Sequence, residues 1–468
     1  MAYGDSFVYD PSQSPVRQIL MSATWLKYLP SILRDRLEGR HGLQQAVGNT
    51  GWLLLDKVLR MVLGLVIGIW MARVLGPVKF GQFNYALAFV ALFSSFASLG
   101  LDRVVVRNLV NAPEAAAQTL GSALLLKLSG SLLAIFLCIA SILFVNPDDS
   151  GIQILVAVLS LGMFFQAFDV IDFWFQSQVI SKYAVIARLP SLLIFTGVRI
   201  FLILGALSLT MFAWAQALEV LVAAIGLLVV YRYLGGGVAD WRPGYVQALA
   251  LIRECWPLIF AGLSVMLYMK VDIVMLGKIS GDRSAGIYSA ATRLSEGFYF
   301  IPMIIASSVA PMLLRARARS PEQYLQGLFR LYLLMVRMSL VIAVPLAVVS
   351  PLLIELLFGS DFLESADVLR VHVWVAIAVF LGVASSQYLT NEGLQKLSLY
   401  RTLIGLVINI LLNLFLIPAY GAVGAAIATL VSYFIATFSI IISRQGAGQG
   451  LLMLRALNPA AILGFRSG

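Results

Sequence analysis

The sequence predicts an all-α protein that crosses a membrane many times, and three observations support this fold class. First, 60% of its 468 residues are hydrophobic and only 12% are charged, a balance that a water-soluble chain of this length could not bury in one core. Second, apolar runs of about 20 residues, the length that crosses a bilayer, recur along the chain. Third, Lys and Arg gather in alternate loops between these runs.

About twelve apolar runs follow one another along the chain. The first six cover residues 52–71, 80–100, 120–145, 152–175, 183–207 and 209–231. The next six cover residues 256–276, 286–314, 328–351, 368–389, 399–417 and 419–442. Each run is long enough to cross the hydrocarbon layer as a helix, because about 20 helical residues span about 30 Å.

The distribution of basic residues predicts the orientation. The loops on one side of the membrane contain few basic residues, mainly Arg73, Lys79, Lys278 and Arg283. The other, richer side is expected to be cytoplasmic, which places both termini in the cytoplasm and explains the formal charge of +10 without a nucleic-acid partner. The basic residues on that side are Arg34, Arg36, Arg40, Arg103, Arg107, Lys182, Arg232, Arg242, Arg253, Arg315, Arg317, Arg319, Lys396, Arg401, Arg444 and Arg455.

The two halves of the chain look duplicated. Leu75-Gly76 followed by Phe80-Gly81 is echoed about 200 residues later by Leu276-Gly277 and Gly286-Ile287. We therefore expect two six-helix lobes in the same orientation, related by an axis along the membrane normal. The lobes are predicted at 49–233 and 251–443, with a cytoplasmic linker at 234–250 and a cytoplasmic tail at 444–468. A cytoplasmic segment at 1–48 is expected to form an interfacial helix or a basic tail.

Six charged side chains inside the predicted spans are candidates for a substrate-binding cavity. An ionised group at mid-bilayer costs about 2.5–3.5 kcal/mol, so spans that keep several are expected to pair them or use them. A mostly cationic set suits an anion such as pyrophosphate that crosses through a hydrated cavity. The alternatives are local pairing, as of Asp56 with Arg60 or Arg293 with Glu296, and snorkelling of Lys127 to the interface. The candidates are Arg60, Lys127, Arg199, Lys270, Asp272 and Arg293.

Three acidic residues are candidates for ion coupling. Asp169 and Asp172 share a face of the fourth run, and Glu219 lies in the sixth. A carboxylate inside a span can hold a proton or a cation whose gradient drives transport. Capping a helix or pairing with basic loops is the alternative for the first two.

The sequence predicts no catalytic residue, no metal site and no cofactor. Cys138 and Cys255 are far apart and have no further Cys or His at ligand spacing, and the two histidines, His41 and His372, are isolated. The sequence contains no Walker-type nucleotide-binding loop. A membrane enzyme such as an oligosaccharide polymerase or ligase is therefore disfavoured, since the outer loops are short and bring no catalytic constellation together.

Several motifs occur in order: Arg73-Val-Leu-Gly-Pro, Trp256-Pro257-Leu258, Val271-Asp272, Leu357-Phe358-Gly359, and a small-residue run at 421–429. With these motifs the chain, from Asn49 onward, resembles the Wzx-type polysaccharide/oligosaccharide flippase family. That family belongs to the multidrug/oligosaccharidyl-lipid/polysaccharide exporter (MOP) superfamily. In this sequence the family-like charged positions are Arg60, Asp272 and Arg293, and the segment before Gly48 is one that the family does not require.

The resemblance implies a two-lobed, MATE-like bundle in the cell inner (plasma) membrane, with a central cationic cavity and alternating access. The implied cargo is a polyprenyl-pyrophosphate-linked oligosaccharide for cell-surface or exopolysaccharide biosynthesis, and transport is expected to be coupled to an ion gradient. The expected partners are this anionic lipid-linked oligosaccharide, membrane lipids, and glycosyltransferases and a polysaccharide polymerase of the same assembly.

Two alternatives stay open. A MATE-like cation or drug antiporter has the same architecture, but its cavity should favour carboxylates and aromatic rings over cations. A transport-inactive scaffold would instead recruit glycosyltransferases through the basic cytoplasmic face.

Overall fold

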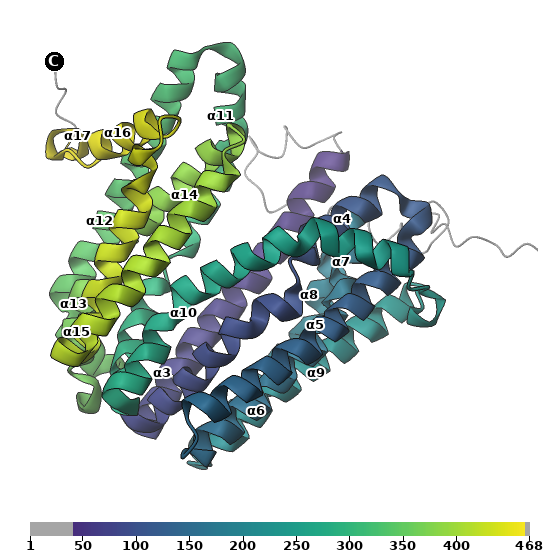
Figure 1. Ribbon diagram of the computed structural model, residues 1–468, viewed down its shortest axis with the longest axis horizontal. Coiled ribbons are helices and arrows are strands. Elements are labelled where there is room, and N and C mark those ends of the chain that lie inside the picture. Colours follow the sequence, from purple (N-terminus) through teal and green to yellow (C-terminus); the bar gives the residue numbers. More distant parts are fainter. Residues whose placement is uncertain (1–40, 464–468) are drawn as a thin grey trace, which may run out of the picture.

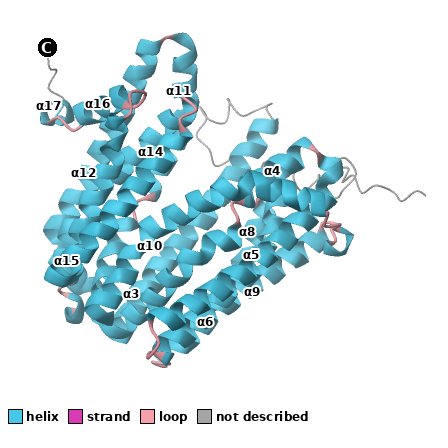
Figure 2. Cartoon of the chain, viewed as in Figure 1, coloured by secondary structure: helices cyan, strands magenta, loops and turns pink. Residues whose placement is uncertain are grey.

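The computed structural model of the protein describes residues 41–463, so the predicted N-terminal segment at 1–48, with Arg34, Arg36 and Arg40, lies almost wholly outside the described residues. Within 41–463 the chain is helical almost throughout and contains no strand (Figure 2). The main helices are α3 (His41–Ser98), α4 (Leu101–Asn111), α5 (Ala116–Val145), α6 (Ser150–Phe165), α7 (Val170–Ser177), α8 (Lys182–Leu204), α9 (Leu209–Tyr233), α10 (Tyr245–Glu296), α11 (Phe300–Arg319), α12 (Pro321–Phe358), α13 (Ser365–His372), α14 (Val375–Asn391), α15 (Gln395–Phe438), α16 (Ala447–Ala456) and α17 (Pro459–Leu463).

Nine helical segments of the described chain are long and apolar enough to cross a membrane. Three of them each consist of two helices joined by a kink. In α3, α10 and α15 the kink is a single residue with non-helical backbone angles, namely Gly76, Gly281 and Gly421. At about 1.5 Å per residue, each of these helices would be far longer than a bilayer is thick if it were straight. Dividing each at its glycine gives twelve segments, the number that the sequence predicts.

The helices form two groups that converge at one end and diverge at the other (Figure 1). The first group holds the helices from α3 to α9, and the second holds those from α11 to α15. Helices α3 and α10 pack against each other where the groups meet, and α10 also packs along α15. The all-α, two-lobed fold predicted from the sequence is confirmed.

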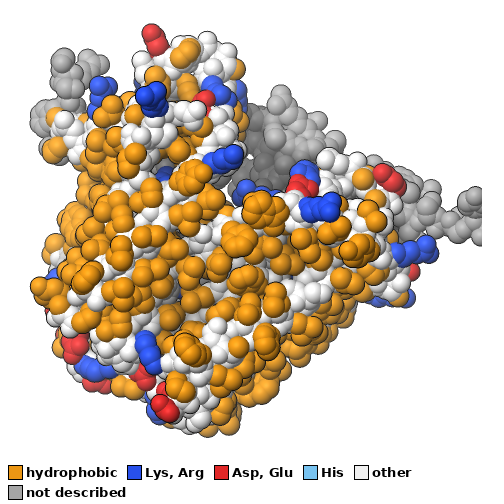
Figure 3. Space-filling view, viewed as in Figure 1, with side chains coloured by type: hydrophobic (Ala, Val, Ile, Leu, Met, Phe, Trp, Pro, Cys, Tyr) orange, Lys and Arg blue, Asp and Glu red, His pale blue; other side chains and the backbone are white. Residues whose placement is uncertain are grey.

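Large hydrophobic side chains cover the outside of both lobes in a broad belt, while charged side chains gather at the two ends (Figure 3). Phe144, Phe201 and Val348, for example, are largely exposed. Exposed apolar area on this scale is unfavourable in water and suits a lipid surround. The protein is therefore a multi-pass membrane protein.

In α3 and α10 the chain reverses direction at a glycine with a positive φ angle. The positions of these two glycines change the alignment of the two halves that the sequence suggests. Gly76 has φ 73° and ψ 171°, and Gly281 has φ 84° and ψ 173°. Gly281, rather than the predicted Gly277, is thus the counterpart of Gly76. A side chain with a Cβ would be strained at these angles, which is why glycine occupies both turns.

Some predicted spans are interrupted where the sequence showed only a continuous apolar run. The run at 286–314 breaks after Glu296, and α11 starts at Phe300. Pro302 has no N–H to donate to Phe298, and Ile301 donates to the Phe298 carbonyl instead at 3.0 Å. The runs at 152–175 and 368–389 are interrupted at Gln166–Asp169 and at 373–374.

The predicted linker and tail are both structured. In the linker, the backbone N–H of Arg242 donates to the Ala117 carbonyl at 3.2 Å, and that of Gly244 donates to Ser122 Oγ at 3.0 Å. This segment therefore lies against α5 of the first lobe. In the tail, α16 packs on α12, and Gln449 contacts the Tyr332 hydroxyl.

Helix α10 contacts both lobes. Near its start, Glu254 pairs with Arg107 of α4 at 2.6 Å, and Leu258 lies against Gly100. Further along, Tyr268 packs against Gly405 of α15. The helix that opens the second half of the chain thus begins on the first lobe and ends in the second.

Candidate functional site

The lobes meet most closely where the turns of α3 and α10 cross. A Cβ placed on Gly81 would fall 1.8 Å from the Asp282 carbonyl oxygen, and one on Gly286 would fall 1.9 Å from the Pro77 carbonyl oxygen. Both obstacles are backbone atoms, so no side-chain rotation could relieve them. The two backbones are in direct contact because glycine is present at both positions.

Polar contacts reinforce this closed end. Gln82 Nε2 donates to Asp282 Oδ2 at 2.8 Å, and Lys278 Nζ donates to the Val145 carbonyl at 2.5 Å. Arg73 donates to the Leu356 carbonyl at 3.2 Å. Each contact joins a residue of the first lobe to one of the second. Two of the basic residues predicted for the outer loops, Arg73 and Lys278, therefore link the two lobes, whereas Arg283 pairs with Glu364 of its own lobe at 2.7 Å.

The opposite end is open. Four consecutive residues of α3, Trp52 to Leu55, are between 38% and 54% exposed. Four successive positions cover every side of a helix, so this stretch packs tightly against neither lobe. The start of α3 stands between the diverging groups of helices (Figure 1). The two groups of helices therefore diverge at the end that carries the predicted cytoplasmic loops.

Arg293 lies on the seam between the lobes. Its guanidinium carbon is 5.4 Å from the centroid of the Phe80 ring, and a Cβ on Gly68 would fall 1.6 Å from its Nη1 atom. Nη1 is buried and has no hydrogen-bond partner in the described part of the chain. The ring supplies part of the stabilisation of this cation, but one donor stays free for an anion.

Arg60 and Arg199 share one carboxylate inside the first lobe. Arg60 pairs with Asp56 at 3.0 Å and approaches Glu219 at 3.9 Å. Arg199 pairs with Glu219 and donates to Gln216 at 3.0 Å. Arg60 Nη2 is buried and lacks a partner among residues 41–463. These contacts balance Glu219 with two cations, an arrangement that favours a structural ion pair over the predicted coupling role.

Asp169 and Asp172 meet Arg188 near the basic end of the first lobe. Arg188 contacts Asp169 at 2.8 Å and Asp172 at 3.1 Å. Buried Lys127 lies nearby, with its ammonium 4.8 Å from the centroid of the Phe173 ring. The cluster belongs to the interior of the lobe in this conformation, and the roles predicted for its residues stay predictions.

Lys270 is a half-buried cation of α10. No hydrogen bond or ion pair holds its ammonium in the part of the chain that the structure describes. It is two residues from Asp272 in sequence, yet the two side chains do not pair. Lys270 therefore keeps its charge available, like the free nitrogens of Arg60 and Arg293.

Asp272 stands apart from the cations, in a closed polar cluster of the second lobe. Asn413 Nδ2 donates to its Oδ1 at 2.6 Å, and Thr429 Oγ1 donates to its Oδ2 at 2.7 Å. The Tyr288 hydroxyl reaches Oδ2 at 3.2 Å, and Asn413 also donates to Asn409 at 3.0 Å. The Oδ1 atom of Asn413 is buried without a partner in the described chain. A buried carboxylate with only neutral partners, beside a free amide oxygen, can hold a proton or a small cation.

Sequence reasoning missed the partners in this cluster. Asn409 and Asn413 are four apart on one face of an apolar helix, which is a signal that could have been used, because buried amides need partners. Tyr288 and Thr429 gave no comparable signal. Their proximity to Asp272 depends on how α10 and α15 pack.

Known families match this chain across most of its length. The model of the family described as polysaccharide biosynthesis protein matches residues 46–314, and the MatE model matches residues 257–415. The chain belongs to the polysaccharide biosynthesis protein family. The resemblance seen in the sequence, to flippases of the MOP superfamily, is confirmed.

Curated and solved proteins agree with this family. The "Probable flippase AglR" of Haloferax volcanii is 29% identical over 244 residues, which are 50% of this chain and 49% of that protein. The chain spans about half the length, or less, of the curated flippases that it matches. A multidrug resistance MATE family transporter in an inward-facing conformation superposes with a TM-score of 0.69 at 15% identity, covering 85% of this chain and 96% of the other. The lipid II flippase MurJ, in an inward closed conformation, gives 0.67 at 14% identity, covering 86% and 90%.

Proposed function

We propose that the protein translocates a polyprenyl-pyrophosphate-linked oligosaccharide across the cytoplasmic membrane for cell-surface polysaccharide biosynthesis. One observation carries the proposal. Arg293, on the seam where the two lobes meet, and Arg60, inside the first lobe, each keep a buried nitrogen without a partner in the described chain. Permanently charged donors with free hydrogen-bonding capacity suit the oxygens of a pyrophosphate.

The shape of the molecule supports alternating access from the cytoplasmic side. The lobes touch at the Gly81 and Gly286 crossing and separate toward the end that carries the predicted cytoplasmic loops. Two solved transporters that superpose on this chain carry inward-facing and inward-closed descriptions. Arg293 is enclosed in this conformation, so movement of the lobes would bring it into contact with the cargo.

Ion coupling is best supported at Asp272. This carboxylate is buried among neutral partners and has no cation beside it, whereas Glu219, Asp169 and Asp172 are all paired with arginine. A proton or a small cation bound to Asp272 would bridge α10 and α15. Its binding and release would then favour different arrangements of these helices.

The sidedness of the cargo tests the proposal. In cells that lack the protein and any redundant flippase, the lipid-linked oligosaccharide should accumulate on the cytoplasmic leaflet. Wild-type protein should restore its transfer, and Arg293→Ala should not, at equal protein level. Normal sidedness without the protein would contradict the proposal.

The cation antiporter is the main competitor, because the MatE model also matches. An antiporter of cations would gain nothing from arginine nitrogens left free beside the pathway. Tight binding of cationic dyes by the purified protein, together with indifference to polyprenyl pyrophosphate, would favour that function. The scaffold hypothesis predicts that Arg293→Ala leaves polysaccharide export unchanged.

A further inference from the structure

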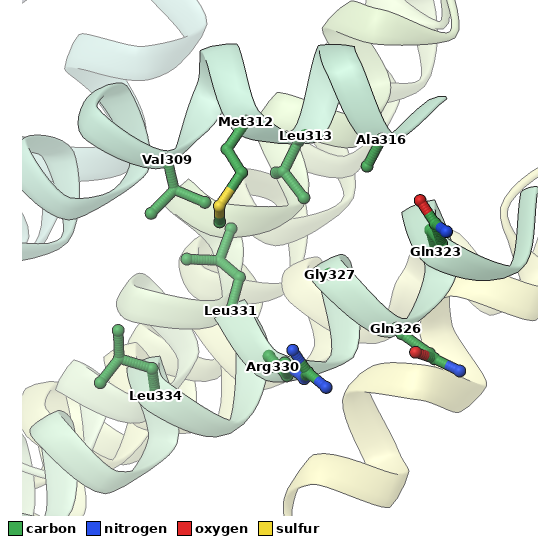
Figure 4. Close-up of a pocket in the computed structure, with 10 residues that line it drawn as sticks. All are labelled: Val309, Met312, Leu313, Ala316, Gln323, Gln326, Gly327, Arg330, Leu331 and Leu334. Atoms are coloured by element: carbon green, nitrogen blue, oxygen red, sulfur yellow. The ribbon is translucent and has the colours of Figure 1, made fainter. Parts of the chain in front are cut away.

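A groove runs between α11 and α12 near the basic end of the second lobe (Figure 4). Its volume is about 360 Å³. Val309 and Met312 of α11 and Leu331 and Leu334 of α12 form apolar walls, and Met312 and Leu331 point toward each other across it. An apolar cleft of this size at the edge of a membrane protein is suited to an apolar chain.

The groove borders the lipid-facing surface of α12. Its α12 residues at 323, 327, 330 and 334 are three or four apart and lie on one face of the helix. Val341, Val348 and Leu352 lie farther along this face and are between 68% and 74% exposed, but Arg337, which contacts α17, lies on the same face before them. Met312 and Leu334 are themselves 58% and 42% exposed, so a chain lying in the groove would border the lipid-facing surface at these two residues.

The wide end of the groove is polar and positively charged. Arg330 lines it beside Gln323 and Gln326. Arg330 is exposed and, among residues 41–463, makes no hydrogen bond or ion pair. Arg315 and Arg319, near the end of α11, are also exposed without an ion pair in the described chain. Arg330 thus places a cation at the polar mouth of an apolar groove, and Arg315 and Arg319 lie farther along α11.

Two other arginines of this region have partners in the described chain. Arg317 pairs with Glu392 at 2.9 Å. Arg337, two turns from Arg330 or about 10 Å along α12, donates to the Ala461 and Ile462 carbonyls at 3.0 Å. Helix α17 thus lies beside Arg337, and Arg330 lies farther toward the basic end of α12.

We propose that this groove binds one anionic phospholipid of the adjacent leaflet. Its phosphate would accept hydrogen bonds from the Arg330 guanidinium and from the amides of Gln323 and Gln326. One acyl chain would lie against Met312 and Leu334. The charge of Arg330 selects an anionic headgroup, and the apolar walls of the groove select a lipid over a free phosphate. The site is independent of the cargo proposed above.

The experiment uses the full chain in bilayer nanodiscs with equal amounts of phosphatidylglycerol and phosphatidylcholine. Native mass spectrometry after extraction counts the lipids that stay bound. The wild-type protein should retain more phosphatidylglycerol than phosphatidylcholine. Arg330→Ala should lower its retention about fivefold, the factor expected for one basic residue at a charged lipid surface. Ala316→Phe, which fills the groove, should lower retention of both lipids.

Arg455→Ala is the matched control. Arg455 is exposed at the same end of the protein, without a described partner and outside the groove, so this variant should retain lipid like wild type. A benzophenone residue in place of Met312 should form a photo-adduct with phosphatidylglycerol that Arg330→Ala removes. Equal retention of the two lipids by wild type, unchanged retention in Arg330→Ala, or no photo-adduct would overturn the proposal. Melting temperature and gel filtration identify a misfolded variant.

Discussion

The crossing of α3 and α10 gives a sharp test of the alternating-access hypothesis. In Gly81→Val the new Cβ would lie 1.8 Å from the Asp282 carbonyl oxygen and 2.8 Å from the Gly286 nitrogen. Both are backbone atoms, so the lobes must separate at this end to make room. Overpacking of a tight contact costs about 1–3 kcal/mol, which shifts a two-state equilibrium by about 5- to 150-fold.

Distances between spin labels measure this shift. Labels at Asp148, after α5, and Asp361, after α12, lie on different lobes at the closed end. Buried Cys138 and Cys255 are first replaced by Ala. In wild type the short distance should dominate, and in Gly81→Val a longer distance should become the main population.

Gly64→Val is the control for this experiment, because a Cβ on Gly64 of the same helix meets nothing within 4 Å. The control should keep the short distance. An unchanged distance distribution in well-folded Gly81→Val would refute the idea that this crossing is the closed gate. A longer distance in both variants would also refute it, since the effect would then not come from the crossing.

Three further substitutions test the charged groups. Asp272→Asn should abolish the dependence of transport on the ion gradient, measured as flux into proteoliposomes with and without the gradient, and persistent dependence would exclude coupling at this residue. Arg293→Gln should weaken binding of polyprenyl pyrophosphate about tenfold, because it removes a charge-assisted hydrogen bond, and equal binding would remove this residue from the site. Glu219→Gln leaves Arg199 and Arg60 without their shared carboxylate and should lower the free energy of unfolding by about 3 kcal/mol; an unchanged denaturation midpoint would show that the pair is not stabilising.

Much of the fold could be predicted from the sequence because lipid imposes a simple pattern. Each apolar run must be helical, since backbone groups have no other hydrogen-bond partners in hydrocarbon. Interruptions inside the runs escaped prediction. The break before Phe300 depends on Pro302, a residue type that many membrane helices tolerate without breaking. The sequence predicts a turn between the runs at 256–276 and 286–314, but not that the single glycine Gly281 makes it, because glycine is frequent throughout such helices.

The site was less predictable than the fold, because hydropathy does not show which helices face each other. Asp56 and Arg60 are four apart, and their pairing followed from helical spacing. Arg199 and Glu219 pair across α8 and α9, which no spacing rule gives. Asp272 was grouped with the cations because it is a charged residue inside a span and a family-like position, and only packing shows that it lies in a cluster of its own.

The double attachment of α10 bears on how the lobes stay together. Glu254 and Leu258 hold its start to the first lobe, while its later turns pack on α15. Cutting the chain between Gly235 and Gly236 would leave α10 whole on the second fragment, with its contacts to both lobes available. The halves of this protein should therefore reassemble when they are made as two separate polypeptides, since a shared helix rather than covalent continuity joins them.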